Sequence, residues 1–168
     1  MAQIMKNETP VDAATLALAE RLATALPDDA LVTCRPALVD ARSRRRTPSI
    51  VLLSPDVGAV AIEPADTEWQ TALAAAAGYA RTLREHLERE QQSLPVFHAV
   101  ITPAANTSAH VVPENALNDR AVLRQALVRL RADADAPGAE AVQLAAKALR
   151  APTPETALPA IETEVSEA

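Results

Sequence analysis

The stretch from Ser49 to Trp69, SIVLLSPDVGAVAIEPADTEW, decides the fold. Two short apolar runs, Ile50–Leu53 and Ala59–Ile62, flank a link that contains Pro, Asp and Gly, which are residues of tight turns. Neither run alternates cleanly between apolar and polar residues, and this is typical of strands buried on both faces. The stretch therefore predicts an antiparallel hairpin in the centre of a sheet. It also raises the question of what Glu63 does at the end of the second run.

The segments on both sides of this hairpin are assigned from apolar spacing and turn residues. A strand is predicted over residues 30–40, at an edge or with a bulge because Pro36 cannot donate to a ladder. The segment Val96–Ile101 follows a helix, which predicts a buried strand parallel to a central one. Helices are predicted over residues 11–26, 67–91, 118–131 and 139–149, and a short strand is predicted over 110–112. In the second helix, Thr67 is the expected N-cap, and Arg81–Glu85 and Glu85–Arg89 are expected to form pairs on the outer face.

The length and composition of the chain indicate how many domains it forms and where in the cell we expect it. The 168 residues, 49% of them hydrophobic, suit one domain over residues 11–150, followed by an acidic, Pro-rich segment, 151–168, that we expect to be a disordered tail. The net charge of −6 argues against a broadly basic nucleic-acid-binding surface. Cys34 is the single cysteine, the N-terminus does not resemble a signal peptide, and no apolar run is long enough to cross a membrane. We expect a cytoplasmic protein, with Ala, Arg and Pro usage of a bacterial style.

The order of the predicted elements is helix, strand, strand, strand, helix, strand. This αβββαβ core resembles the restriction-endonuclease-like fold of the PD-(D/E)XK superfamily. The segments LPDDALVTCRPAL, VLLSPDVGAVAIE and LPVFHAVITP resemble the nuclease-related domain (NERD) more specifically. The resemblance covers residues 15–152 and implies an α/β sandwich with a mixed central sheet of four strands, closed by two C-terminal helices.

The resemblance also assigns candidate site residues. Active members of the superfamily bind a divalent metal through an Asp at the start of the second core strand and through an E-x-K motif at the end of the third. Here these positions hold Ser49, Glu63 and Ala65, and Glu20 matches a supporting glutamate on the first helix. Mg²⁺ prefers several hard oxygen ligands, so the loss of the Asp and the Lys implies a degenerate catalytic site. We expect Glu63 to be a relic that binds no catalytic metal.

Several of these residues also have simpler interpretations. Glu63 can reach solvent at the strand end or cap the following helix, and Glu20 can lie on a solvated helix face. The three histidines, His86, His98 and His110, lack the spacing of metal ligands, and His98 fits a satisfied core histidine. The sequence around Cys34 shows no sign of a base that would activate it as a nucleophile, so we do not expect that role.

The stretch ARSRRRTP is the most basic part of the chain. Arg42, Arg44, Arg45 and Arg46 can contact phosphates, since guanidinium groups suit bidentate contacts with them. The alternative is a solvated loop between strands, over which the acidic C-terminal segment can fold back.

Three classes of function remain. The first is a catalytically degenerate nuclease-like domain that binds nucleic acid, with DNA held by the arginine stretch, or a protein partner. The second is an active nuclease with a rearranged site, which alone requires Mg²⁺ or Mn²⁺ as a cofactor. The third is a structural or regulatory interaction protein with no DNA contact. Fold alone does not choose among them, because function lies in the site.

Overall fold

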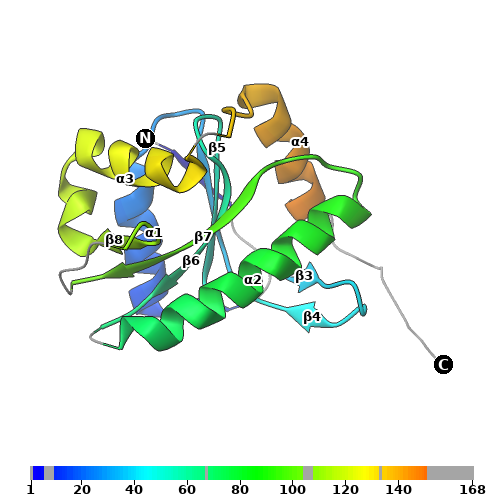
Figure 1. Ribbon diagram of the computed structural model, residues 1–168, viewed down its shortest axis with the longest axis horizontal. Helices are drawn as coiled ribbons and strands as arrows, with labels where there is room; N and C mark the ends of the chain where they lie inside the picture. The colour runs from blue at the N-terminus through cyan, green and yellow to red at the C-terminus, as the bar shows by residue number, and fades with distance from the viewer. Residues whose placement is uncertain (1, 6–9, 67, 104–107, 133, 151–168) are drawn as a thin grey trace.

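The structure is a computed structural model that describes residues 2–5, 10–66, 68–103, 108–132 and 134–150. It is an α/β fold with a mixed six-stranded sheet in the order β1-β2-β5-β6-β7-β8 and a separate β3–β4 pair (Figure 1). The strands are β1 Gln3–Met5, β2 Leu31–Cys34, β3 Leu38–Val39, β4 Arg45–Arg46, β5 Ile50–Ser54, β6 Gly58–Pro64, β7 Val96–Thr102 and β8 Val111–Pro113. The helices are α1 Ala13–Ala25, α2 Trp69–Arg89, α3 Arg120–Arg131 and α4 Ala139–Arg150, with a 3-10 helix, η1, at Glu114–Asn118.

The central hairpin forms as the sequence predicts. Strands β5 and β6 are antiparallel, with Ile50 opposite Ile62 and Ser54 opposite Gly58. Gly58 has a φ of 127°, and the carbonyl oxygen of Pro95 lies where a side chain would begin, so only glycine fits this turn. Strand β7 then pairs with β6 in parallel, which confirms the predicted crossover.

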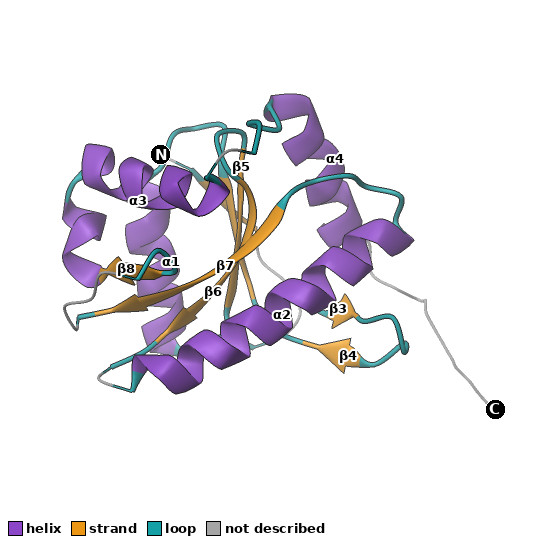
Figure 2. Cartoon of the chain, viewed as in Figure 1, coloured by secondary structure: helices purple, strands orange, loops and turns teal. Residues whose placement is uncertain are grey.

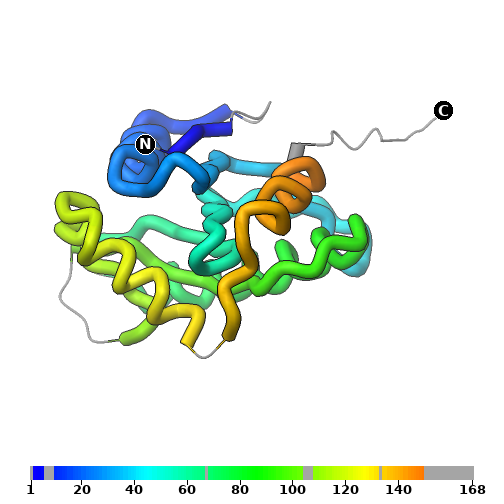
Figure 3. Tube along the Cα trace, turned by 90° about the horizontal axis from the view of Figure 1, so that it is seen from above, coloured from blue at the N-terminus to red at the C-terminus, as the bar shows by residue number. Residues whose placement is uncertain are grey.

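Helices cover both faces of the sheet, so the core has two halves (Figures 2 and 3). Helices α1 and α3 pack on one face, where Leu22 and Leu123 meet Leu52 and Ile62 of the sheet. Helices α2 and α4 pack on the other face, where Leu83 meets sheet side chains that alternate with the first set. Both faces of β5 and β6 are therefore buried, which explains their unbroken apolar sequence.

The sheet is wider than the four strands implied by the resemblance. Strand β1 pairs in parallel with β2, and β8 pairs in parallel with β7, so the sheet has six strands. The sequence analysis did not predict β1, because three residues carry too little periodicity to identify a strand.

The continuous strand predicted over residues 30–40 is wrong. Strand β2 stops after Cys34, because Arg35 adopts a φ of 48° and turns the chain out of the main sheet. Pro36 follows and has no N–H with which to continue the ladder. The next residues form β3, which pairs with β4 as a small hairpin outside the main sheet. The basic stretch that the sequence suggested as a loop is thus the tip and second strand of a hairpin.

The helix boundaries follow from local capping. Asp12 caps α1 by accepting from the backbone N–H and the hydroxyl of Thr15, and Asp119 caps α3. The predicted N-cap of α2, Thr67, lies outside the described residues, as does the predicted tail over 151–168. Among the described helices, none has both the length and the apolar character needed to cross a bilayer.

Candidate nucleic-acid interface and the Ser49–Glu63 pair

Two of the residues assigned by family resemblance are in direct contact. Ser49 directly precedes β5 and Glu63 lies near the end of β6, so the hairpin register brings them together. The backbone N–H of Ser49 donates to Oε2 of Glu63 at 2.8 Å, and its hydroxyl donates to Oε1 at 2.8 Å. A single residue therefore satisfies both oxygens of the carboxylate, and Glu63 is tied to the neighbouring strand.

The other two assigned residues do not join this pair. Glu20 is exposed on α1, which packs on the face of the sheet that contains Ile62. Glu63 follows Ile62 in the strand and so projects from the opposite face. Ala65 contributes only a methyl group, and its backbone N–H donates to the Ile101 carbonyl. Within the described ranges, no group of three or more His, Cys, Asp and Glu side chains is placed to hold a metal ion.

The remaining candidates from the sequence lie in structural roles. The rings of His98 and His110 stack with centroids 4.1 Å apart and planes 6° apart, and Nδ1 of His110 lies 3.0 Å from the His98 carbonyl oxygen. Burial lowers the pKa of His98, and the positive charge that His110 gains on protonation lowers it further. Burial raises the pKa of the Cys34 thiol, and the charge of Glu20 adds to this, so the thiolate is disfavoured.

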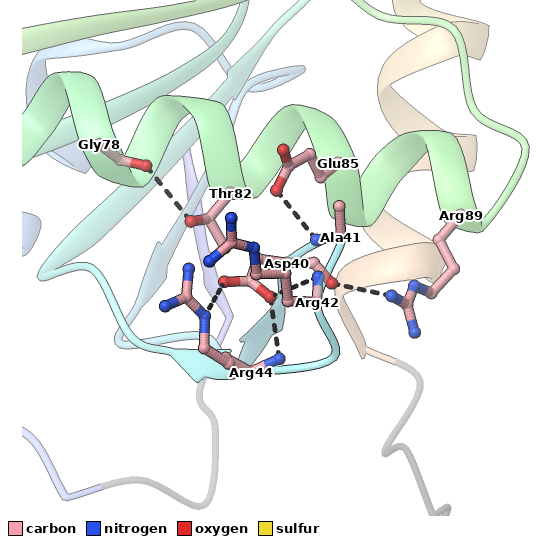
Figure 4. Close-up of polar contacts among 8 residues, drawn as sticks. All are labelled: Asp40, Ala41, Arg42, Arg44, Gly78, Thr82, Glu85 and Arg89. Carbon is pink, nitrogen blue, oxygen red and sulfur yellow. Dashed lines mark hydrogen bonds and ion pairs between the residues drawn. The ribbon is translucent and has the colours of Figure 1, made fainter.

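The β3–β4 pair with its connecting turn, residues 38–46, is called the arginine hairpin below. A buried carboxylate, Asp40, orders its turn (Figure 4). Its Oδ1 accepts from the backbone N–H groups of Arg42 at 2.9 Å and Arg44 at 2.8 Å, while Oδ2 accepts from Nε of Arg44 at 2.9 Å. These bonds, the backbone N–H of Arg44 foremost, hold the pKa of Asp40 below its usual value. An Asp at the start of a polar turn was the available signal for this role.

Helix α2 fixes the position of the arginine hairpin from one side. Oε1 of Glu85 accepts from the Ala41 N–H at 2.9 Å, and the guanidinium of Arg89 donates to the Asp40 carbonyl at 2.8 Å (Figure 4). The sequence analysis had assigned Glu85 and Arg89 to pairs along the outer face of the helix. Both instead bind backbone groups of the hairpin, and such long-range partners leave no local signal in the sequence.

The four arginines of the basic stretch are not equivalent. Arg42, Arg44 and Arg45 are exposed. Arg44 donates through Nε to Asp40, and its side chain nevertheless remains 63% exposed. Arg46 is half-buried, and its guanidinium carbon lies 5.1 Å from the ring centroid of Tyr79 on α2, a cation–π contact. Three arginines therefore face solvent, while the fourth packs on the helix.

His86 connects the arginine hairpin to the rest of the fold. Its Nδ1 accepts from the Val39 N–H at 3.1 Å, so the ring proton must lie on Nε2, which is 3.2 Å from the carbonyl oxygen of Ala148 in α4. One buried imidazole thus joins β3, α2 and α4. The ring can make both bonds only in its neutral form, because protonated Nδ1 cannot accept. In agreement, burial lowers the pKa of His86 below its ordinary 6.5.

The stability of the protein should therefore fall in mild acid. Because the pKa of His86 is lowered on folding, the unfolded chain binds this proton first, and the contribution to stability is complete above pH 6.5 and decreases below it. The shift at His98 acts in the same direction. We expect the free energy of unfolding in urea to be flat just above pH 6.5 and to drop below it, with His86 contributing up to about 1.4 kcal/mol per pH unit. A free energy of unfolding that is unchanged one pH unit below 6.5 would show that the contacts of His86 tolerate its protonation.

Comparisons with known proteins identify no relative. No protein-family model matches the chain, and neither a curated protein nor a solved structure does so. The arginine hairpin and the Ser49–Glu63 pair must therefore be interpreted from their own geometry.

Proposed function

We propose that this protein is a non-catalytic nucleic-acid-binding module, built on a restriction-endonuclease-like domain of the NERD type whose catalytic site is degenerate. The observation that carries the proposal is the arginine hairpin: three exposed arginines, Arg42, Arg44 and Arg45, on a turn whose backbone is fixed by the buried carboxylate of Asp40.

The order of elements supports the proposed fold. Apart from β1 and the β3–β4 pair, the elements up to β7 follow the αβββαβ order along the chain, as α1, β2, β5, β6, α2 and β7. The four strands are also neighbours in the sheet in that sequence, and α3 and α4 follow as the two closing helices. The positions that correspond to the metal-binding Asp and Glu, here Ser49 and Glu63, meet at 2.8 Å, as residues of one ancestral site would.

The chemistry of the Ser49–Glu63 pair supports the loss of catalysis. Two adjacent carboxylates repel each other, and a dication relieves that repulsion, whereas here a serine supplies two donors and satisfies the glutamate without an ion. A metal bound beside Ser49 would gain one carboxylate and at most one hydroxyl from this pair, and the rest of its coordination shell would be left to water. Without a second charged ligand or a lysine, little stabilisation is available for the transition state of phosphodiester hydrolysis.

The arginine hairpin suits a phosphate backbone better than a neutral partner. Guanidinium groups form bidentate bonds with phosphate oxygens, and contacts of this kind do not require base recognition. The turn is already ordered by Asp40, Glu85 and Arg89, so binding orders side chains and leaves the backbone unchanged. The overall charge of −6 means that any attraction for a phosphate backbone must come from a local cluster of arginines such as this one.

The metal-binding half of the proposal is tested by titration calorimetry. We expect Mg²⁺ and Mn²⁺ to release little heat with the wild type and with Glu63→Gln, and we expect neither protein to nick plasmid DNA. The physical reason is that Glu63 already has two hydrogen bonds from Ser49. Tight Mn²⁺ binding that disappears in Glu63→Gln together with DNA cleavage would instead establish an active nuclease with a rearranged site.

The binding half is tested by fluorescence anisotropy with a labelled DNA duplex over a salt series. We expect saturable binding at low salt that weakens as salt rises, with a slope of about −2.7 in log K against log salt if three arginines each contact a phosphate. A wild type that shows no binding at low salt would favour a protein partner as the ligand of this domain.

A further inference from the structure

A cavity lies between the end of α1, the turn of the central hairpin and the first half of α3, and is called the α3 cavity below. Its volume is about 230 Å³. Its described lining residues include none of those assigned by the family resemblance or placed in the arginine hairpin. The α3 cavity is therefore separate from the interface proposed above.

The inner wall of the α3 cavity is apolar. It is formed by four buried residues, namely Ala25 and Leu26 at the end of α1, Val57 in the hairpin turn and Leu127 on α3. An apolar cavity of roughly 150 Å³ can hold a benzene molecule. The α3 cavity is larger, so it admits a ring with small substituents, and the apolar surface that such a ligand removes from water favours binding.

The mouth of the α3 cavity carries two arginines. Arg120 and Arg124 line it from α3 and are exposed, which places their charges toward solvent. Nε of Arg124 donates to Oδ2 of Asp56 at 3.2 Å, and the guanidinium of Arg120 donates to the Leu26 carbonyl at the longer distance of 3.5 Å. A guanidinium carries several N–H donors, so these contacts leave others for a ligand. The charge of Asp28 also interacts with that of Arg120, but Asp28 does not line the cavity.

A buried hydroxyl adds a further donor to the lining. Ser54 is 5% exposed, and its Oγ accepts from the Asp56 N–H at 3.2 Å. The hydroxyl proton can then be donated to a ligand oxygen, because a hydroxyl accepts and donates at the same time. The polar groups around the cavity are therefore mainly donors, and two of them are charged. Such a set suits a ligand that accepts hydrogen bonds and carries a negative charge.

We propose that the α3 cavity binds a small carboxylate whose apolar body has about the size of a substituted benzene ring. The body contacts Ala25, Val57 and Leu127, while the carboxylate accepts from Arg120 and Arg124 at the mouth. A ligand of about ten non-hydrogen atoms is expected to have a dissociation constant on the order of 1 mM or tighter. Figure 1 shows α1 and α3 at the opposite end of the molecule from β3 and β4, so this site does not depend on nucleic-acid binding.

The first test is a titration of the full-length protein with para-toluate, followed by amide chemical shifts. We expect saturable changes centred on Leu26, Ser54, Val57 and Leu127, with the amides of the arginine hairpin unchanged. The neutral para-toluamide has the same shape and should bind at least about tenfold more weakly, because it lacks the charge that strengthens the hydrogen bonds to the arginines. The absence of saturable changes at these residues, or equal binding of the two compounds, would overturn the proposal.

The second test changes the charge at the mouth. Arg120→Gln should weaken the binding of para-toluate about tenfold or more and leave that of para-toluamide unchanged. Arg129→Gln is the matched control, since Arg129 is exposed on the same helix, does not line the cavity and carries the same charge. We expect this control to change the affinity for para-toluate by less than about twofold, because salt screens distant charges. Equal weakening by the two substitutions would show that net charge, and not a site at the α3 cavity, attracts the carboxylate.

Discussion

The variant Arg42→Gln/Arg44→Gln/Arg45→Gln should lose DNA affinity by a factor on the order of 10² at about 0.1 M salt, and its salt slope should fall by about 2.7. Each guanidinium that neutralises a phosphate releases counterions, and removing three such contacts removes that gain. Arg46 is retained because it packs on Tyr79, so its loss would mix binding with stability. Anisotropy titrations at several salt concentrations measure both quantities.

The chain offers a matched control for this variant on α3. Arg120, Arg124 and Arg129 are exposed arginines on a helix at the other end of the molecule, and Arg120→Gln/Arg124→Gln/Arg129→Gln changes the net charge by the same amount (Figure 1). We expect this control to change affinity only a few-fold, through the long-range field. If the α3 variant loses affinity and the hairpin variant does not, the binding surface has been assigned to the wrong end of the fold.

The substitution His86→Leu should destabilise the protein by roughly 2–4 kcal/mol at neutral pH. The leucine fills the buried space but leaves the Val39 N–H and the Ala148 carbonyl without their partner, and each unsatisfied buried group costs about 1–3 kcal/mol. The variant should also lose the part of the acid dependence that His86 contributes. Urea unfolding gives the free energy, and amide exchange at Val39 reports on the hairpin directly.

Thr82→Val is the matched control for His86→Leu on the same helix. Thr82 is equally buried, but its hydroxyl donates within α2 to the Gly78 carbonyl, so no long-range contact is lost. We expect the free energy of unfolding to change by less than about 1 kcal/mol, since the Gly78 carbonyl keeps its backbone partner within the helix. A His86→Leu variant that matched Thr82→Val in stability, with slow exchange at Val39, would show that the hairpin is held without the imidazole bridge.

The central hairpin could be predicted because its signals are local. The apolar runs around Pro55 and Gly58 determine both the turn and the burial of the two strands, and no distant residue is needed to recognise them. Helices α3 and α4 follow in the same way from apolar spacing and from the break at Gly138. Strand β1 could not be predicted, because it exists only through its pairing with β2.

The candidate interface was predictable only in part. The clustered arginines stand out in the sequence, but their division into three exposed side chains and one packed on Tyr79 depends on how β4 lies against α2. The role of His86 was missed for the same reason, because it bonds groups 47 and 62 residues away along the chain. Asp40 was missed although its partners are local, because the predicted strand over residues 30–40 did not include the turn at Arg35 that places Asp40 at the start of a second turn.

The proximity of Ser49 and Glu63 could be expected from the family resemblance, but the form of their contact could not. The family resemblance assigned both positions to one site, and the hairpin register brings them within 2.8 Å of each other. The simpler interpretations of Glu63, a solvent-directed carboxylate or a helix cap, did not include a serine partner on the adjacent strand. Ser49 satisfies the carboxylate through its backbone as well as its hydroxyl, a geometry that residue types alone do not specify.

The most direct test of the account is a map of amide chemical shifts during titration of the full-length protein with a short DNA duplex at low salt. Binding by the arginine hairpin predicts that the largest changes fall on residues 40–46 and on the facing part of α2 around Glu85 and Arg89. The amide chemical shifts of Ser49 and Glu63 should change little, and the addition of Mg²⁺ should not alter the pattern of shift changes. Changes centred on Ser49 and Glu63, changes centred on α3, or the absence of any change would contradict it.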